Sequence, residues 1–117
     1  DGRIAYDEIY GGLALDRSEG DRLADGLGSA SVLMLASHGV IAVGPSVADA
    51  FNDLYYLERA CMFQILARSD GEELRTIPDE VRRHTRQQMA GDLPKVAQRH
   101  FTAIKRMLDR QEPEYRH

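Results

Sequence analysis

The chain has 117 residues and a formal net charge of −4, with acidic and basic side chains mixed along its length. This length suffices for one domain with a hydrophobic core and leaves no room for a second domain. The acidic balance argues against sequence-independent nucleic-acid binding, which needs a basic surface that displaces counterions. The single cysteine, Cys61, excludes an internal disulfide and is typical of a reducing compartment, and no apolar run is long enough to cross a bilayer.

The first thirty residues predict a short strand followed by a short helix. Residues 2–6 could form the strand, and Gly11-Gly12 a turn after it. Ser18 is the predicted N-cap of the helix, because a serine side chain accepts backbone N–H groups there and acidic residues follow it. Gly26 and Gly28 are expected to end this helix.

Two apolar runs, residues 31–36 and 40–44, meet at Ser37-His38-Gly39. Runs of this kind, separated by a short segment that ends in glycine, predict a tight β-hairpin. His38 would lie at its tip, where rigid strands support the imidazole from both sides. A metal ligand or an acid/base group is one interpretation, because supported loops often carry functional groups. The other is a polar turn residue without a function, and the histidine alone does not decide between them.

The clearest helix is predicted over residues 47–68. Ser46 and Asp49 form an approximate capping box in which aspartate replaces the usual glutamate. Counting 3.6 residues per turn places Glu58 in the middle of the apolar stripe of this helix. A carboxylate there must be paired, hydrogen-bonded or protonated, because burying it alone is costly. Glu58 is therefore either a group that orients the hairpin or a ligand histidine, or a structural partner for an arginine or for loop amides.

Two further helices complete the chain. Pro78 begins a polar helix that is expected to reach Met89, and a last helix is predicted from near Pro94 to Arg110. A basic cluster at residues 82–86 is either a solvated helix face or a contact for an anion or a subunit. The last helix has an apolar stripe that consists of Ala97, Phe101, Ile104 and Leu108.

Residues 33–51, LMLASHGVIAVGPSVADAF, give a strand, a Ser-His-Gly turn, a strand ending in glycine, and a helix beginning Ser-x-x-Asp-Ala. This order resembles the C-terminal half of the class II aldolase/adducin family, with its Asn-His-Gly or similar turn and its Thr/Ser-x-x-Glu-Ala helix start. Residues 54–60 continue the match to the family's Leu-Glu-x-Ala segment, and Glu19-Gly20 fits the bacterial adducin-like branch. The resemblance covers about residues 6–75 and depends on order and spacing together.

The resemblance implies a metal ligand at His38. In enzymes of this family the histidine of that turn is one ligand of zinc or another divalent metal. Ser37 replaces the commoner asparagine, a polar change that should leave the ligand intact. The family's other ligands form a His-x-His pair upstream, preceded by a catalytic glutamate, and this chain has no His-x-His. Catalytic zinc sites use three protein ligands, so one imidazole is not enough. Residues 1–117 are therefore expected to be the C-terminal portion of a single larger domain.

The fold implied by the resemblance is α/β, a three-layer α/β/α sandwich around a mostly antiparallel sheet. The implied reaction is metal-assisted cleavage of a carbon–carbon bond in a small hydroxy-carbonyl substrate, with the metal as Lewis acid. Some members use the same site for epimerisation or decarboxylation. Some also bring a tail tyrosine over the site, which makes Tyr115 a weak catalytic candidate. Its other interpretation is an aromatic side chain that caps the last helix.

Two classes of function stay open. One is a metal-dependent aldolase-type lyase, a cytoplasmic homo-oligomer (tetrameric in the family) with a small-molecule substrate and without nucleic-acid or membrane partners. The other is a non-catalytic interaction module, because adducin-like domains share the fold and serve in cytoskeletal assembly. His38 favours the enzyme, since a purely structural domain has no physical need for an imidazole at that tip. In either case the isolated residues are expected to expose a sheet edge and an apolar face, and either to associate strongly or to need a missing N-terminal part for solubility.

Overall fold

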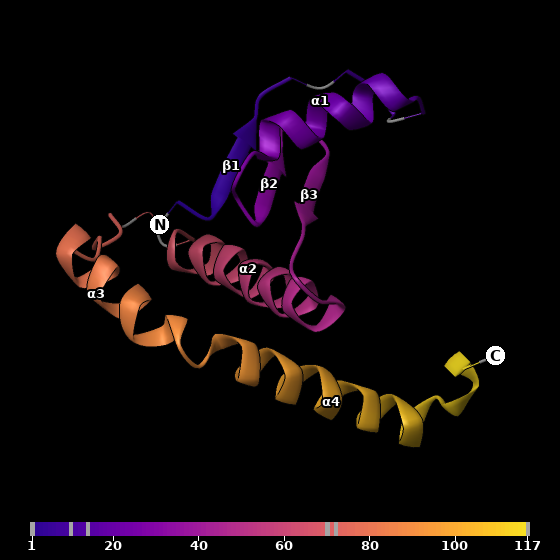
Figure 1. Ribbon diagram of the computed structural model, residues 1–117. Coiled ribbons are helices and arrows are strands. Elements are labelled where there is room, and N and C mark those ends of the chain that lie inside the picture. Colours follow the sequence, from indigo (N-terminus) through magenta and orange to yellow (C-terminus); the bar gives the residue numbers. More distant parts are fainter. Residues whose placement is uncertain (1, 10, 14, 70, 72, 117) are drawn as a thin grey trace.

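The structure is a computed structural model that describes residues 2–9, 11–13, 15–69, 71 and 73–116 (Figure 1). Its elements follow in the order β1 (Ile4–Asp7), α1 (Arg17–Leu27), β2 (Val32–Leu35), β3 (Gly39–Ala42), α2 (Val47–Ala67), α3 (Asp79–Ala90), α4 (Leu93–Gln111) and a short 3-10 helix, η1 (Pro113–Arg116). The predicted succession of strand, helix, hairpin and three helices is therefore confirmed.

The sheet is mixed. β2 lies between β1, which pairs with it in parallel, and β3, which pairs with it antiparallel. One of the two strand pairings in the described part of the chain is parallel, so the expectation of a mostly antiparallel sheet is not confirmed. The physical reason is the connection through α1, because a helical crossover returns the chain in the same direction as the strand that preceded it.

The hairpin has a three-residue loop. Leu35 pairs with Gly39, which leaves Ala36, Ser37 and His38 in the loop. The His38 N–H donates to the Leu35 carbonyl at 3.3 Å. The left-handed conformation of this loop falls on Ser37, with φ of 56°, while Gly39 already belongs to β3.

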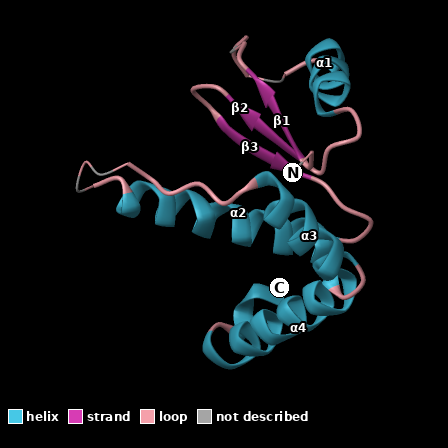
Figure 2. Cartoon of the chain, turned by 90° about the vertical axis from the view of Figure 1, so that its left-hand side faces the viewer, coloured by secondary structure: helices cyan, strands magenta, loops and turns pink. Residues whose placement is uncertain are grey.

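Helices cover both faces of the sheet (Figure 2). Ile41 of β3 lines a pocket with Leu23 of α1, whereas Met34, which pairs with the preceding Val40, lines a groove with Phe51 of α2. Because successive side chains of a strand point to opposite faces, α1 and α2 lie on opposite faces of the sheet. The described residues therefore form an α/β/α arrangement.

α4 packs against α2, on the side away from the sheet (Figures 1 and 2). The rings of Phe51 and Phe101 meet edge to face with centroids 5.5 Å apart, and Ala97 is buried. The predicted apolar stripe of the last helix is thus the face that packs on α2.

One predicted helix cap is confirmed and the other is wrong. Ser46 caps α2, and its side chain accepts the Asp49 N–H at 3.2 Å. α1 is capped by Asp16 instead of Ser18, because the Asp16 carboxylate accepts the Glu19 N–H at 2.9 Å. The Ser18 hydroxyl lies in the first turn and donates to Asp16 at 2.7 Å. Both residue types suit an N-cap, so the spacing alone could not separate them.

The core is small and the exposed surface is large. The buried apolar side chains among the described residues are those of Val32, Leu33, Ala48 and Ala97. The solvent-accessible surface is 9588 Å², against about 6,400 Å² for a compact monomer of this mass. The second half of α2 exposes large apolar side chains, namely Phe63, Ile65 and Leu66. No helix in the described part of the chain is long and apolar enough to span a membrane.

Candidate functional site

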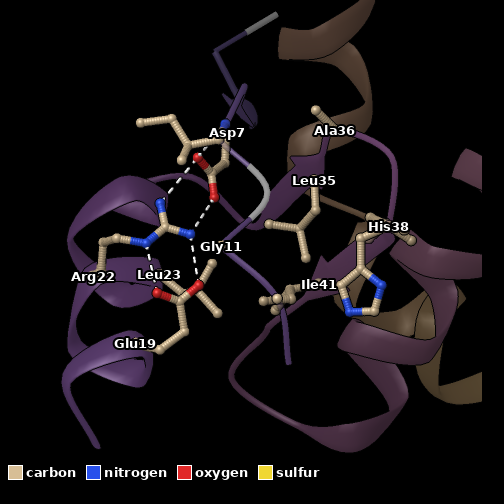
Figure 3. A pocket seen from close by; sticks show the side chains of 13 residues that line it. Asp7, Gly11, Glu19, Arg22, Leu23, Leu35, Ala36, His38 and Ile41 are labelled. Carbon is tan, nitrogen blue, oxygen red and sulfur yellow. Dashed lines mark hydrogen bonds and ion pairs between the residues drawn. The ribbon is translucent and has the colours of Figure 1, made fainter. Parts of the chain in front are cut away.

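His38 lies at the rim of a pocket of about 320 Å³ between the sheet and α1. The backbone turn holds its side chain at the hairpin tip, where it is exposed. Figure 3 shows His38 on one side of this pocket and a cluster of charged side chains on the other, with Leu35 and Ile41 between them. We call it the His38 pocket; its lining includes Asp7, Glu19, Arg22, Leu23, Leu35, His38 and Ile41.

The charged cluster is built around Arg22 of α1. Its Nη1 and Nη2 atoms donate to the two Asp7 oxygens at 3.0 and 2.8 Å. Its Nε and Nη2 atoms donate to the two Glu19 oxygens at 2.8 and 2.7 Å. The guanidinium therefore uses four of its five N–H groups on two carboxylates, in the forked geometry that makes such pairs strong.

The cluster stays charged down to acidic pH. Hydrogen bonds from Arg22, and a further one from the Ile9 N–H, lower the pKa of Asp7. Arg22 likewise lowers the pKa of Glu19. The two carboxylates in turn raise the pKa of Arg22. With two negative charges and one positive charge, this wall of the pocket carries a net charge of −1 at neutral pH.

Only one half of this cluster is recognisable in the sequence. Glu19 and Arg22 are three residues apart, the spacing at which side chains on a helix meet. The other half, Asp7, is fifteen residues from Arg22 and lies on a strand. Nothing in the spacing shows that this strand runs beside α1.

The described residues do not form a complete metal site. They include no group of three or more His, Cys, Asp or Glu side chains placed to hold a metal ion. Asp7 and Glu19 share the pocket with His38, but their oxygens are engaged by Arg22. His38 could donate one nitrogen to a cation, and a zinc site needs further donors from outside these residues.

Glu58, the second predicted site residue, is not buried. Its side chain is 65% exposed, and its Oε2 atom lies 3.9 Å from Nε of the adjacent Arg59. It borders an apolar groove of about 650 Å³ between the hairpin and α2, which Met34 and Phe51 also line. The periodicity placed Glu58 on the correct face of α2, but that face is open at this point in the described structure. Its orienting role stays a prediction.

Tyr115 lies in η1, directly after α4. Its hydroxyl donates to Oδ1 of Asp109 at 2.7 Å, and Arg116 pairs with the same carboxylate. These contacts agree with an aromatic side chain that closes the end of the last helix. A catalytic role for Tyr115 stays a prediction.

The remaining histidines lie on other elements. His100 of α4 holds Nδ1 3.1 Å from Oδ1 of the buried Asn52, and its ring meets Tyr55 edge to face. His84 is exposed on α3 within the basic cluster of residues 82–86, as expected of a solvated face. His117 falls outside the described residues.

The family model described as "Class II Aldolase and Adducin N-terminal domain" matches residues 1–65. The chain belongs to the class II aldolase/adducin family. Among solved structures, it is similar to an aldolase II superfamily protein from Pseudomonas syringae, with a TM-score of 0.83 and 42% identity over 99% of this chain and 47% of that one.

Two curated relatives show the breadth of the family. A Pseudomonas aeruginosa protein named "Putative aldolase class 2 protein" is 38% identical in an alignment of 111 positions that covers 92% of this chain and 43% of that protein. Alpha-adducin from Rattus norvegicus is 31% identical in an alignment of 121 positions that covers 92% of this chain and 16% of that protein. The chain thus spans less than half the length of these relatives, one of which is named as an aldolase and the other as an adducin.

Proposed function

We propose that this chain is part of a metal-dependent aldolase-type lyase that cleaves a carbon–carbon bond in a small hydroxy-carbonyl compound. In this proposal His38 is one donor to zinc or another divalent cation, and residues outside the described part supply the other donors. The observation that carries the proposal is the imidazole at the hairpin tip, exposed at the rim of a pocket with an ionised wall. Membership of the class II aldolase/adducin family supports it.

The size and lining of the His38 pocket agree with a small polar substrate. About 320 Å³ is at the lower end of the range for ligand pockets. Part of the lining is apolar, with Leu23, Leu35 and Ile41. The carboxylate oxygens of Asp7 and Glu19 can accept hydrogen bonds from the hydroxyl groups of a substrate.

The wider architecture is also a proposal. We infer that the complete domain is a three-layer sandwich with a mostly antiparallel sheet, of which residues 1–117 are the C-terminal portion. The large exposed apolar surface supports burial against further chain or further subunits, and a homo-tetramer in the cytoplasm is the assembly we expect.

A turnover experiment tests the proposed function. The natural-length protein would be stripped of metal with a chelator, and aldehyde release from small hydroxy-carbonyl compounds would be measured before and after zinc is restored. We expect zinc-dependent release that is lost in His38→Ala. His84→Ala is the matched control, because His84 is an exposed histidine on α3, and it should keep full activity. Zinc-dependent release that survives in His38→Ala would contradict the role of His38.

A non-catalytic interaction module is the second candidate. Two observations favour it, the similarity to alpha-adducin and the open apolar groove along α2. Absence of turnover with every metal, in a protein whose stability does not change with metal, would support this candidate over the lyase.

A further inference from the structure

We infer that Arg22 is a positioning residue for His38, and that it acts through Asp7 and the end of β1. The inference deepens the proposed function and rests on it, since the position of His38 affects ligand binding only if His38 is a donor. It concerns residues of three elements that meet at one end of the sheet, namely α1, β1 and the β2–β3 turn (Figure 3).

The first link joins α1 to the last residue of β1. Asp7 ends β1, and its side chain is only 10% exposed. Both of its oxygens accept from Arg22, and Oδ1 also accepts the Ile9 N–H at 3.2 Å. A side chain fixed by three donors also restrains the backbone that carries it.

The second link joins β1 to the turn. The Asp7 carbonyl accepts the N–H of Ala36 at 2.9 Å. Ala36 is the first of the three loop residues, and His38 is the last. Asp7 therefore holds Arg22 with its side chain and the His38 turn with its backbone.

The turn needs such support because of Ser37. A left-handed φ of 56° is strained for a residue with a Cβ atom. Such a conformation persists when the surrounding structure over-determines it. The hydrogen bonds from Ala36 to Asp7 and from His38 to Leu35 define the two ends of the loop and supply that constraint.

Glu19 fixes the orientation of the guanidinium. It binds Nε and Nη2 of Arg22 and leaves Nη1 and the second Nη2 hydrogen directed at Asp7. A lysine has the charge but not this planar fork, so it could not hold both carboxylates in the same geometry. The inference therefore predicts that the shape of residue 22 is important as well as its charge.

The test compares Arg22→Gln and Arg22→Lys with Arg82→Gln in the natural-length protein. Arg82 is the matched control, because it pairs with Asp79 at the same i,i+3 spacing on the exposed helix α3. The first readout is hydrogen exchange at the Ala36 amide relative to amides in the middle of α2. We expect faster exchange at Ala36 in Arg22→Gln, an intermediate rate in Arg22→Lys and no change in Arg82→Gln.

The second readout is the affinity for Co²⁺, measured by its absorption spectrum. Changes in groups that orient metal ligands typically lower affinity by 10–100-fold, and we expect a loss of about that size in Arg22→Gln. If Arg22→Gln fails to fold, Glu19→Gln replaces it in the test. This variant weakens the contact that orients the guanidinium but keeps the ion pair between Arg22 and Asp7. We expect the same changes in exchange and Co²⁺ affinity, to a smaller extent.

The outcomes separate this inference from the proposed function. Unchanged exchange at Ala36 in both Arg22→Gln and Glu19→Gln would overturn the inference. So would unchanged Co²⁺ affinity in these variants when His38→Ala lowers it. If His38→Ala leaves Co²⁺ affinity unchanged, the proposed function fails, and the exchange at Ala36 alone decides whether Arg22 positions the turn.

Discussion

Ser37 and Gly44 show how single residues shape the hairpin that carries His38. Ser37 adopts the left-handed conformation that glycine and asparagine tolerate better. Gly44 lies where the chain leaves the sheet and begins α2. A Cβ atom at Gly44 would lie 2.9 Å from both the Ala50 nitrogen and the Asp49 Cβ atom. Position 37 therefore holds a residue in a strained conformation, and position 44 has no room for a side chain.

Replacing Ser37 should therefore change stability in a predictable order. We expect Ser37→Asn to raise the free energy of unfolding by about 0.5 kcal/mol, because asparagine enters the left-handed region at lower cost. Ser37→Val should lower it by about 1–2 kcal/mol, because a β-branched side chain is a strong outlier there. Urea unfolding of the natural-length protein measures both, and equal stability of the two variants would show that the turn is not left-handed.

Gly44→Ala should destabilise the protein by about 1–3 kcal/mol, the usual cost of overpacking, because the atoms it meets include helix backbone that cannot move aside. Gly26→Ala in α1 is the control. A Cβ atom there meets nothing within 4 Å, and alanine in a helix is favoured over glycine by about 1 kcal/mol. The same urea measurements apply, and a neutral Gly44→Ala would contradict the close packing of the strand end on α2.

At the scale of elements, an ion-pair cluster helps to hold α1 to the sheet. None of its residues is buried, and its Arg22 bridges to Asp7 of β1. The Asp16 cap adds a carboxylate whose pKa is lowered by the Ser18 hydroxyl and the Glu19 N–H. The attachment of α1 therefore depends in part on ionised carboxylates.

This dependence predicts a loss of stability in acid. Unfolded carboxyls titrate near pH 4, and those of Asp7 and Glu19 titrate lower in the folded protein. Their contribution is complete above the unfolded pKa values and is lost as pH falls through the folded ones. The double variant Asp7→Asn/Glu19→Gln should thus be less stable at neutral pH and show a shallower acid limb than the native protein. Urea midpoints measured across the acid range test this.

Asp79→Asn is the control for the acid experiment, because Asp79 is an exposed carboxylate on α3, away from the His38 pocket. It should keep the acid limb of the native protein. If stability fell equally steeply with decreasing pH in the native protein and in the double variant, the role of the Arg22 cluster in holding α1 would be contradicted.

The sequence predicted the hairpin, α2 and α4 because their signals are local. The apolar runs of the hairpin, the Ser46 cap of α2 and the apolar stripe of α4 are each local features of the sequence. The position of Glu58 on α2 was also predictable, but its exposure was not, because periodicity does not show what covers a face. Likewise, the pairing of Asp7 with Arg22 joins a strand to a helix, and only folding brings these two elements together. The metal interpretation of His38 came from the family resemblance and not from spacing.

At the scale of the whole molecule, the main feature is the large apolar surface that is exposed to solvent. The radius of gyration is 16.9 Å, against about 13 Å for a compact chain of this length. β1 and β3 are the two edges of the described sheet, and the groove along α2 is open beside β3. A surface of this kind is typical of a chain that packs against further structure.

We therefore expect the isolated 117 residues to associate in solution at micromolar concentration. Leu54→Glu should weaken the association, because Leu54 lines the open groove on α2. Leu15→Glu is the control, since Leu15 is 85% exposed and lies outside that groove. Sedimentation velocity measures all three proteins. A native chain that sediments as a monomer would contradict this expectation.

Metal stoichiometry of the natural-length protein tests the central role of His38 most directly. The native protein and His38→Ala would be purified in parallel, equilibrated with zinc, and analysed for bound metal by mass spectrometry. We predict close to one zinc per chain in the native protein and a large loss in His38→Ala, with the folded state of both confirmed by circular dichroism. Equal zinc content in the two proteins would contradict it.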